Sequence, residues 1–230
     1  MKNKQFDITE QNRVRRVAKR GLYDHESVFR VIDAAWIGHI GITTPPTDER
    51  PSGVTVIPML HARIDDQLIF HGATSSRLMK YLSSGQPICV SFGIVDGLAL
   101  AKSLFHHSMN YRSAVVFGSG ALEEDPDQRI AALKAISDKV MPGRWDDARQ
   151  PNQKELKATA IVTMKIDTAS AKIRTGAPVD EEDDHHLPVW SGVVPIKPVI
   201  EQGISDAFSQ TTPEPVYIRE FRDNFNSKKV

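Results

Sequence analysis

Residues 53–82, GVTVIPMLHARIDDQLIFHGATSSRLMKYL, decide the fold class of this chain. GVTVIPML is rich in β-branched and apolar residues and predicts a strand, and HARIDDQLIFHG predicts a hairpin that turns at Asp65 and Asp66. The stretch then offers a glycine, three hydroxyl residues and an arginine before an apolar pattern of helical period. We therefore expect a helix over residues 74–84, entered through the polar turn HGATSSR (residues 71–77).

The sequence on either side predicts many strands and few helices between them. Six or seven short strands in this arrangement favour a mainly β fold, an antiparallel barrel with peripheral helices. Parallel βαβ units would need a helix after most strands, and those helices are missing from the pattern. The expected strands are 36–43, 53–60, the 61–72 hairpin, 87–95, 110–124, 159–167 and 170–176, with a short extended segment at 187–196.

The remaining segments are expected to be helices, connections and two flanking extensions. Asp24 is a candidate cap for a helix that begins at His25, and Pro126 lies near the first turn of a strong amphipathic helix. We expect residues 1–20 to form an arm, 21–197 the barrel domain, and 198–230 a tail that packs on the barrel or on a partner subunit. Smaller expectations are a helical turn or two at 153–159, an irregular connection or short helix at 96–109, a weak helix at 199–208 and an extended end at 215–221.

Composition excludes several classes of function. Lys plus Arg and Asp plus Glu both number 29 in 230 residues, so net charge gives no reason to expect nucleic acid or an acidic membrane as a partner. A single cysteine, Cys89, excludes an intrachain disulfide and is expected to be a buried small hydrophobe. The basic, polar start has no apolar core of a secretory signal, and no run approaches the roughly 18 apolar residues of a membrane span. We therefore expect a cytoplasmic protein.

Two polar stretches are candidates for binding chemistry. In HGATSSR, small residues let an anion approach the backbone, hydroxyls donate further hydrogen bonds, and Arg77 presents a guanidinium to phosphate oxygens. The alternative is that Thr74 or Ser75 only caps the helix. In HHSMNYRS (residues 106–113), strand alternation puts Asn110 and Arg112 on one face, which suits a ligand in a barrel mouth or an ordinary polar edge strand.

No metal site is expected from these motifs. Adjacent His106 and His107 diverge and lack the usual ligand spacing for zinc, and the acidic loop VDEEDDHH (residues 179–186) reads as a solvated surface.

Six stretches in this order resemble the flavin-nucleotide-binding branch of the pyridoxamine 5′-phosphate oxidase-like superfamily, which is akin to the nitroimidazole-resistance proteins. The resemblance covers about residues 20–197 and implies an FMN-binding split β-barrel that is antiparallel and Greek-key-like. It also implies a homodimer with two flavins at the subunit interface and a small-molecule substrate. The stretches are GLYDHESVFRVIDAAWIGHIGI, VIPMLHAR, LIFHGATSSRLMKYL, DGLALAKSLFHHSMNYRSAVVFG, SAKIRTGAPVD and LPVWSGVVPI.

The resemblance further implies which residues contact the flavin. VIPM is similar to the strand beside the isoalloxazine ring, and HGATSSR resembles the segment that binds the FMN phosphate. Residues 110–112 match a later flavin-contacting strand, and Trp190 is similar to a tryptophan segment close to the ring. The implied cofactor-binding residues are Val56, Ile57, Pro58, Met59, His71, Gly72, Thr74, Ser75, Ser76, Arg77, Asn110, Tyr111, Arg112 and Trp190.

Departures from the pattern of the true oxidases narrow the expected function. The oxidases have an Arg-Lys pair where this chain has Arg77 and Leu78, and an Arg-x-His beyond the tryptophan that this chain lacks. We therefore expect an FMN-dependent oxidoreductase or reductase of a small conjugated or nitro-type substrate, with His71 and His107 as candidate acid–base residues. Two alternatives stay open: a flavin-binding or storage module without turnover, and a haem-binding protein with a histidine as axial ligand.

Overall fold

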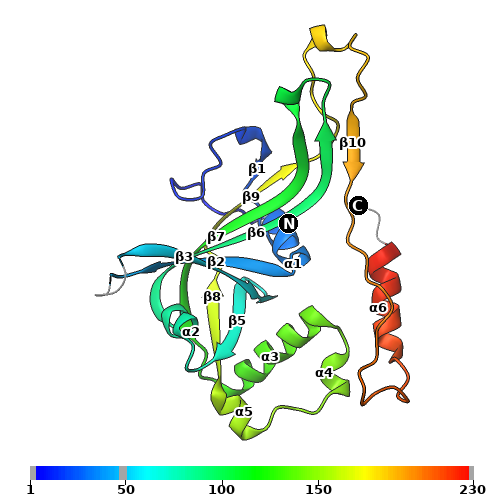
Figure 1. Ribbon diagram of the computed structural model, residues 1–230. Helices are drawn as coiled ribbons and strands as arrows, with labels where there is room; N and C mark the ends of the chain where they lie inside the picture. The colour runs from blue at the N-terminus through cyan, green and yellow to red at the C-terminus, as the bar shows by residue number, and fades with distance from the viewer. Residues whose placement is uncertain (1–3, 47–50, 228–230) are drawn as a thin grey trace.

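The computed structural model describes residues 4–46 and 51–227 and shows one twisted antiparallel sheet with helices around it (Figure 1). The sheet runs in the order β3-β2-β6-β7-β8-β5-β4, while β9 pairs with β7 and β1, and β10 pairs with β6. Because β3 and β4 end the path without pairing with each other, the barrel is open, as expected for a split barrel. The strands are β1 (Gly21–Leu22), β2 (Ile37–Thr44), β3 (Gly53–Leu60), β4 (Ala62–Ile64), β5 (Gln67–Ala73), β6 (Ser84–Leu100), β7 (Ser108–Leu122), β8 (Thr159–Lys165), β9 (Thr168–Arg174) and β10 (Gly192–Pro195).

Six α-helices surround this sheet in the described residues. They are α1 (His25–Ala34), α2 (Arg77–Leu82), α3 (Pro126–Val140), α4 (Arg144–Asp147), α5 (Gln153–Ala158) and α6 (Val216–Ser227). Asp24 caps α1 by accepting from the Ser27 N–H at 2.8 Å, and Asp125 caps α3 in the same way at Gln128. None of the described helices is both long and apolar enough to cross a bilayer.

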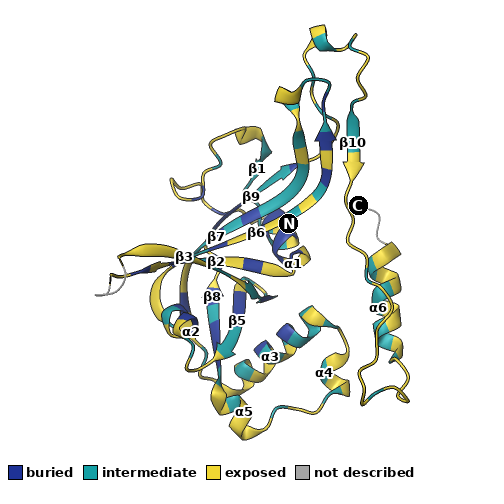
Figure 2. Ribbon diagram, in the orientation of Figure 1, coloured by how far each residue is buried: buried dark blue, intermediate teal, exposed yellow. Residues whose placement is uncertain are grey.

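Two apolar clusters hold the elements together (Figure 2). The larger lies on the inner face of the sheet and is closed by α1 and α2, with Phe70 and Phe92 among its largest buried side chains. The smaller joins α3 to the outer side of β4, β5 and β8 through Ile69, Ile136 and Ile161. The two faces of β5 therefore belong to different clusters. Phe70 packs inside the barrel, and Ile69 packs towards α3.

Strands β6 and β7 continue beyond the barrel as a ribbon (Figure 1). β10 pairs along the end of β6, with Gly192 opposite Leu100. The loop before β10 is tied to the ribbon tip, since Asp180 accepts from the Lys102 N–H at 2.7 Å and Lys102 Nζ donates to the Val189 carbonyl at 2.9 Å. A register shift between Val95 and Gly97 marks a bulge where the ribbon leaves the barrel.

In the two terminal segments, only the secondary structure expected at residues 199–208 and 215–221 is corrected. The arm is fixed by its buried Phe6 and Asn12. Residues 199–208 form no helix, and the expected extended end is instead part of α6. α6 buries none of its residues. Its contacts with the rest of the chain include Tyr217, which donates to Asp147 at 2.7 Å, Asn226, which donates to the Ile200 carbonyl at 2.9 Å, and Phe225, whose ring centroid lies 6.3 Å from that of Trp36.

Other expectations were close, with three corrections. The helix predicted at 74–84 is shorter, residues 77–82, because residues 74–76 form the turn before it. Residues 96–100, expected as an irregular connection, are the end of β6. Cys89 is half-buried on the outer face rather than sealed in the core, and burial raises the pKa of its thiol.

Candidate functional site

The HGATSSR turn connects the end of β5 to α2 and is fixed by backbone hydrogen bonds. The Thr74 N–H donates to the Ala158 carbonyl at 2.9 Å, and the Ser76 N–H donates to the Ala73 carbonyl at 2.9 Å. Ser76 is the helix cap, because its Oγ accepts from the Met79 N–H at 3.5 Å. One of the two roles considered for this motif, capping of the helix, is therefore observed. The capping residue is Ser76 rather than Thr74 or Ser75.

The other polar side chains of the turn face solvent. Thr74, Ser75 and Arg77 are exposed, and within the described residues their side chains make no hydrogen bond or ion pair. Two hydroxyls and one guanidinium are thus available to an anionic group at the same turn. Gly72 is required by packing, since a Cβ there would lie 2.9 Å from Met79 Cγ.

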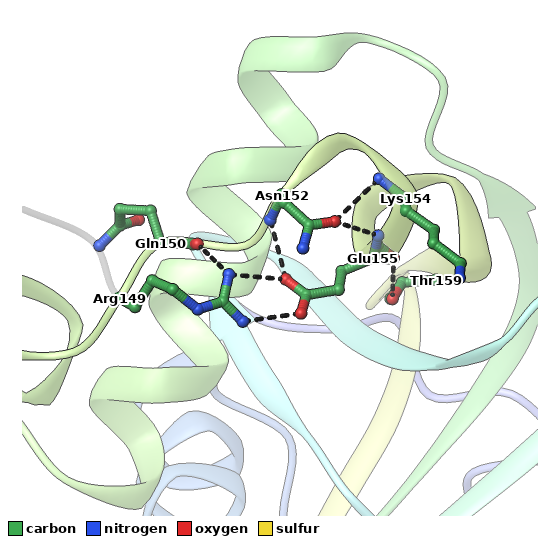
Figure 3. Close-up of polar contacts among 6 residues, drawn as sticks. All are labelled: Arg149, Gln150, Asn152, Lys154, Glu155 and Thr159. Carbon is green, nitrogen blue, oxygen red and sulfur yellow. Dashed lines mark hydrogen bonds and ion pairs between the residues drawn. The ribbon is translucent and has the colours of Figure 1, made fainter.

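The turn rests on a rigid junction between α5 and β8 (Figure 3). Asn152 Oδ1 accepts from the Glu155 N–H at 3.0 Å, and Glu155 accepts in return from the Asn152 N–H at 2.8 Å, which makes a capping box. Arg149 adds a hydrogen bond to the same carboxylate at 2.7 Å. Because α5 ends at Ala158, whose carbonyl holds Thr74, this cap fixes the base of the HGATSSR turn.

The β3 residues expected beside a flavin ring lie on the edge strand of the sheet. Val56 and Pro58 face outward and are exposed, with Val56 60% exposed, whereas Ile57 and Met59 pack partly against the inner core. β3 pairs only with β2, so its other edge carries no strand partner among the described residues. The backbone along this edge is therefore open, and contact of β3 with a flavin stays a prediction.

The polar residues of β7 are already engaged with one another and with neighbours. Arg112 forms a bidentate ion pair with Asp96 at 2.9 and 2.6 Å, and the pKa of Arg112 is raised by this hydrogen bonding. Asn110 accepts from Arg174 and donates to the Gly176 carbonyl at 3.1 Å. Tyr111 is half-buried between Val95 and Arg174 in register. Asp96 and Arg174 were not predicted, because their partners are distant in the sequence.

Trp190 lies at the far end of the ribbon, 64% exposed, with its ring over Gly192. The HGATSSR turn lies at the opposite end of β6, where the Tyr81 hydroxyl donates to the Pro87 carbonyl at 3.2 Å. From Pro87 to Leu100, β6 covers about 40 Å at the usual strand rise. The expected flavin-binding residues of one chain therefore fall into two separate groups.

The candidate histidines also lie apart. His71 is half-buried on the α3 side of β5, one of its nitrogens (Nδ1) is sealed without a partner, and burial lowers its pKa. His107 is exposed at the ribbon tip, where Nε2 is 3.2 Å from the Ala101 carbonyl oxygen. A third histidine, His61, was not predicted: it is 1% exposed, its Nε2 is 2.9 Å from the Ile32 carbonyl, and burial lowers its pKa to about 4.

No group of three metal-ligating side chains is found within the described part of the chain.

The fold and the motifs agree with comparisons to known proteins. A family model described as pyridoxamine 5′-phosphate oxidase matches residues 24–173, so the chain belongs to this family and the resemblance inferred from the motifs is confirmed. Among solved structures, the flavocytochrome Anf3 from Azotobacter vinelandii is 32% identical, with 93% of this chain and 97% of that chain covered and a TM-score of 0.83. No curated protein sequence matches.

Two further solved structures differ in how much of this chain they cover. An FAD- and haem-binding protein from Mycobacterium smegmatis is 29% identical over 88% of this chain and 97% of that chain, with a TM-score of 0.80. A putative 5-nitroimidazole antibiotic resistance protein from Bacteroides thetaiotaomicron, 19% identical, covers only 66% of this chain and 86% of its own, with a TM-score of 0.53, and shares the fold. The first two relatives thus match most of this chain, whereas the third matches about two thirds of it.

Proposed function

We propose that the chain is a flavin-dependent redox protein that also binds haem. The observation that carries this proposal is the extent of the match to the two relatives described as a flavocytochrome and as an FAD- and haem-binding protein, 93% and 88% of this chain. From the residues alone, flavin and haem were alternatives. Their combination in both relatives supports one protein that holds both.

The flavin phosphate is assigned to the HGATSSR turn. Ser75 and Arg77 are exposed and free of partners in the described residues, and the turn is held by the bond from Thr74 to Ala158. Because α2 has only six residues, hydroxyls and the guanidinium contribute more to this site than the helix dipole. A bound flavin supplies hydride or electron transfer, and the protein positions it.

The ring is assigned to a homodimer interface, where one subunit provides the turn and β3 and its partner provides the ribbon. The roughly 40 Å between the turn and Trp190 along β6 exceeds what one flavin spans, so the two groups cannot serve one flavin within one chain. A second copy brings the ribbon of one subunit to the turn of the other.

The surface of the chain supports this assembly. The chain exposes 14948 Å², against about 10,400 Å² expected for a compact monomer of 25.6 kDa. The excess, roughly 4,500 Å², is enough for an obligate dimer interface and cofactors. An open sheet face carries apolar, small and uncharged polar residues and one histidine across three strands: Val54, Val56 and Pro58 on β3, His39 on β2, and Ser91 and Gly93 on β6.

His71 is the axial haem ligand in this proposal. A ligating imidazole must be neutral, and the pKa of His71 is lowered by burial. No hydrogen bond occupies either ring nitrogen within the described residues, and only Nδ1 is sealed, so Nε2 remains reachable. His61 fits less well, since it is 1% exposed and Nε2 is held by Ile32.

The substrate is proposed to be a small conjugated or nitro-type molecule rather than a pyridoxal phosphate. After Trp190 the chain reads SGVVPIKPVIEQG, without the Arg-x-His element of the true oxidases. A storage role without turnover is the competing proposal, and it predicts a bound flavin that reduced pyridine nucleotides do not reduce. A cytoplasmic location fits the redox chemistry and is part of the proposal.

The test is an absorbance spectrum followed by titrations of the purified full chain. Flavin bands at about 370 and 450 nm together with a Soret band are expected. Arg77→Ala should weaken FMN and FAD binding at least tenfold, and Lys80→Ala on the same helix should not. His71→Ala should remove the Soret band, while His186→Ala should change neither the Soret band nor flavin binding. Flavin affinity that is indifferent to Arg77 would overturn the phosphate assignment.

A further inference from the structure

The N-terminal arm forms one side of an open pocket against the outer face of β7 and β9. The arm is tied to the sheet by Asn12, whose Nδ2 donates to the Asp7 carbonyl at 2.9 Å and to the Ala169 carbonyl at 3.0 Å. The Val14 N–H donates to the Tyr23 hydroxyl at 2.8 Å and fixes the next turn. The pocket beneath has a volume of about 280 Å³, near the lower end of ligand sites.

The pocket is strongly cationic. Four of its lining side chains are basic, Arg13, Arg15, Arg16 and Lys172, and no lining residue is acidic. Glu10, outside the pocket, pairs with Arg13 at 3.4 Å and with Arg15 at 2.5 Å. Arg16 and Lys172 make no ion pair or side-chain hydrogen bond within the described residues. These two charges, one from the arm and one from β9, therefore remain for a ligand.

The floor of the pocket is apolar with hydroxyl groups at intervals. Val115 and Phe117 of β7 are half-buried there, and Ser113 and Ser170 lie on the same face in adjacent positions. An apolar floor that includes an aromatic ring suits a flat heterocycle, and the cationic rim suits phosphate. A simple inorganic anion would use the rim alone and leave the floor unexplained.

We propose that the arm pocket binds the adenylate part of a nucleotide, with the base against Phe117 and Val115 and the phosphate between Arg16 and Lys172. This inference rests on the proposed redox function, which leaves two sources for such a group. One is the adenylate half of FAD, which would make FAD rather than FMN the resident flavin and which requires the arm pocket to lie beside an HGATSSR turn in the dimer, because the two phosphates of FAD are directly linked. The other is a reduced pyridine nucleotide that serves as electron donor.

The direct test is calorimetric titration of AMP into the full chain after removal of bound nucleotide. AMP should bind, and adenosine, which lacks the phosphate, should bind at least tenfold more weakly. The double variant Arg16→Gln with Lys172→Gln should weaken AMP binding at least tenfold, whereas Arg30→Gln, an exposed arginine on α1, should not. No AMP binding, or binding unchanged in the double variant, would overturn the proposal.

Two further titrations separate the sources and the underlying function. If the double variant weakens FAD but not FMN, the pocket holds the adenylate half of the flavin. If it weakens NADPH or NADH and leaves both flavins unchanged, the pocket holds the electron donor; either result supports the site. FMN binding and its loss in Arg77→Ala report on the proposed flavin site independently, so failure of one assignment is visible without the other.

Discussion

Arg112 and Asp96 form a bidentate ion pair at 2.9 and 2.6 Å across the bulge where β6 and β7 leave the barrel. The carboxylate side chain is 11% exposed, so water screens this pair little. Arg112 matches a flavin-contacting position of the family pattern, yet its charge is already balanced within the chain. Its contacts among the described residues therefore tie β7 to β6 at the bulge.

Removing either partner of that pair should destabilise the fold. We expect Asp96→Ala and Arg112→Ala each to cost about 2 kcal/mol of unfolding free energy, because each leaves a half-buried charge unpaired. The double variant should cost less than the sum of the two. Urea unfolding of all four proteins measures this coupling, and strict additivity would show that the two side chains act independently.

Acid should destabilise the protein through His61. The pKa of His61 falls from 6.5 to about 4 on folding, because burial disfavours the imidazolium. Between these values the unfolded chain takes up a proton that the folded chain does not, so stability is complete above pH 6.5 and decreases as the pH falls towards 4. The loss amounts to roughly 3 kcal/mol.

His61→Gln tests that assignment, because glutamine keeps a donor for Ile32 and does not titrate. Its unfolding free energy should be lower at pH 7 and change less between pH 6.5 and 4 than that of the wild type. His186→Gln, on an acidic surface loop, should keep the wild-type slope. An unchanged slope in His61→Gln would assign the acid sensitivity to another group.

Alanine should destabilise the protein at one glycine of the sheet and have little effect at another. A Cβ on Gly120 would lie 2.5 Å from the Leu82 carbonyl oxygen and 2.6 Å from Val162 Cγ1, whereas Gly93 has nothing within 4 Å. Gly120→Ala should cost about 1–3 kcal/mol, and Gly93→Ala should be close to neutral. Thermal and urea unfolding decide this, and equal stability of the two variants would contradict the packing described at the base of α2.

The proposed dimer face predicts a change of mass in solution. Val56→Arg introduces a charge on the open face of β3, where the side chain is 60% exposed in the single chain. Sedimentation equilibrium should give the mass of a dimer for the wild type and 25.6 kDa for the variant. Val140→Arg, with 48% exposure at the end of α3, is the matched control and should stay dimeric. If Val56→Arg remains a dimer, the subunit interface does not include this face of β3.

α6 should loosen when its polar anchor is removed. Tyr217 donates to Asp147 at 2.7 Å and lies 3.2 Å from Arg144, and Tyr217→Phe removes both contacts. Amide exchange in α6 should become faster, while exchange in β6 and β7 should not change. Exchange that accelerates throughout the barrel would mean that α6 supports the whole fold.

Local patterns predicted much of the fold. The hairpin at Asp65, the cap at Asp24 and the long β7 strand each depend on neighbours in sequence, and each was correctly predicted. The end of β6 was not, because its glycine and the alternation around Leu98 gave no sign of β10, which pairs with it from far along the chain. Residues 215–221 alternate enough to resemble a strand, yet Tyr217, Phe221 and Phe225 follow at helical spacing once the window is lengthened.

The residues of the candidate site also fall into those that a local sequence pattern could predict and those that depend on distant partners. HGATSSR could be proposed as a binding segment because its residues are consecutive, and within the described residues the side chains of Ser75 and Arg77 make no hydrogen bond or ion pair. Asp96, Arg174 and His61 acquire their roles only through partners that the sheet brings together, so no single stretch of sequence could point to them.

The order of pairing in the sheet also sets the timing of its assembly during synthesis. β5 pairs at once with β4 in the hairpin, but its other edge is paired only when β8 has been made, since Gln67 pairs with Lys165, and Gly21 on β1 pairs only with Lys172 on β9. A nascent chain therefore carries β5 with an unpaired edge while roughly half of the sequence is still untranslated. Folding should be late and nearly all-or-none, and ribosome-bound intermediates that end before residue 165 should be the natural clients of chaperones.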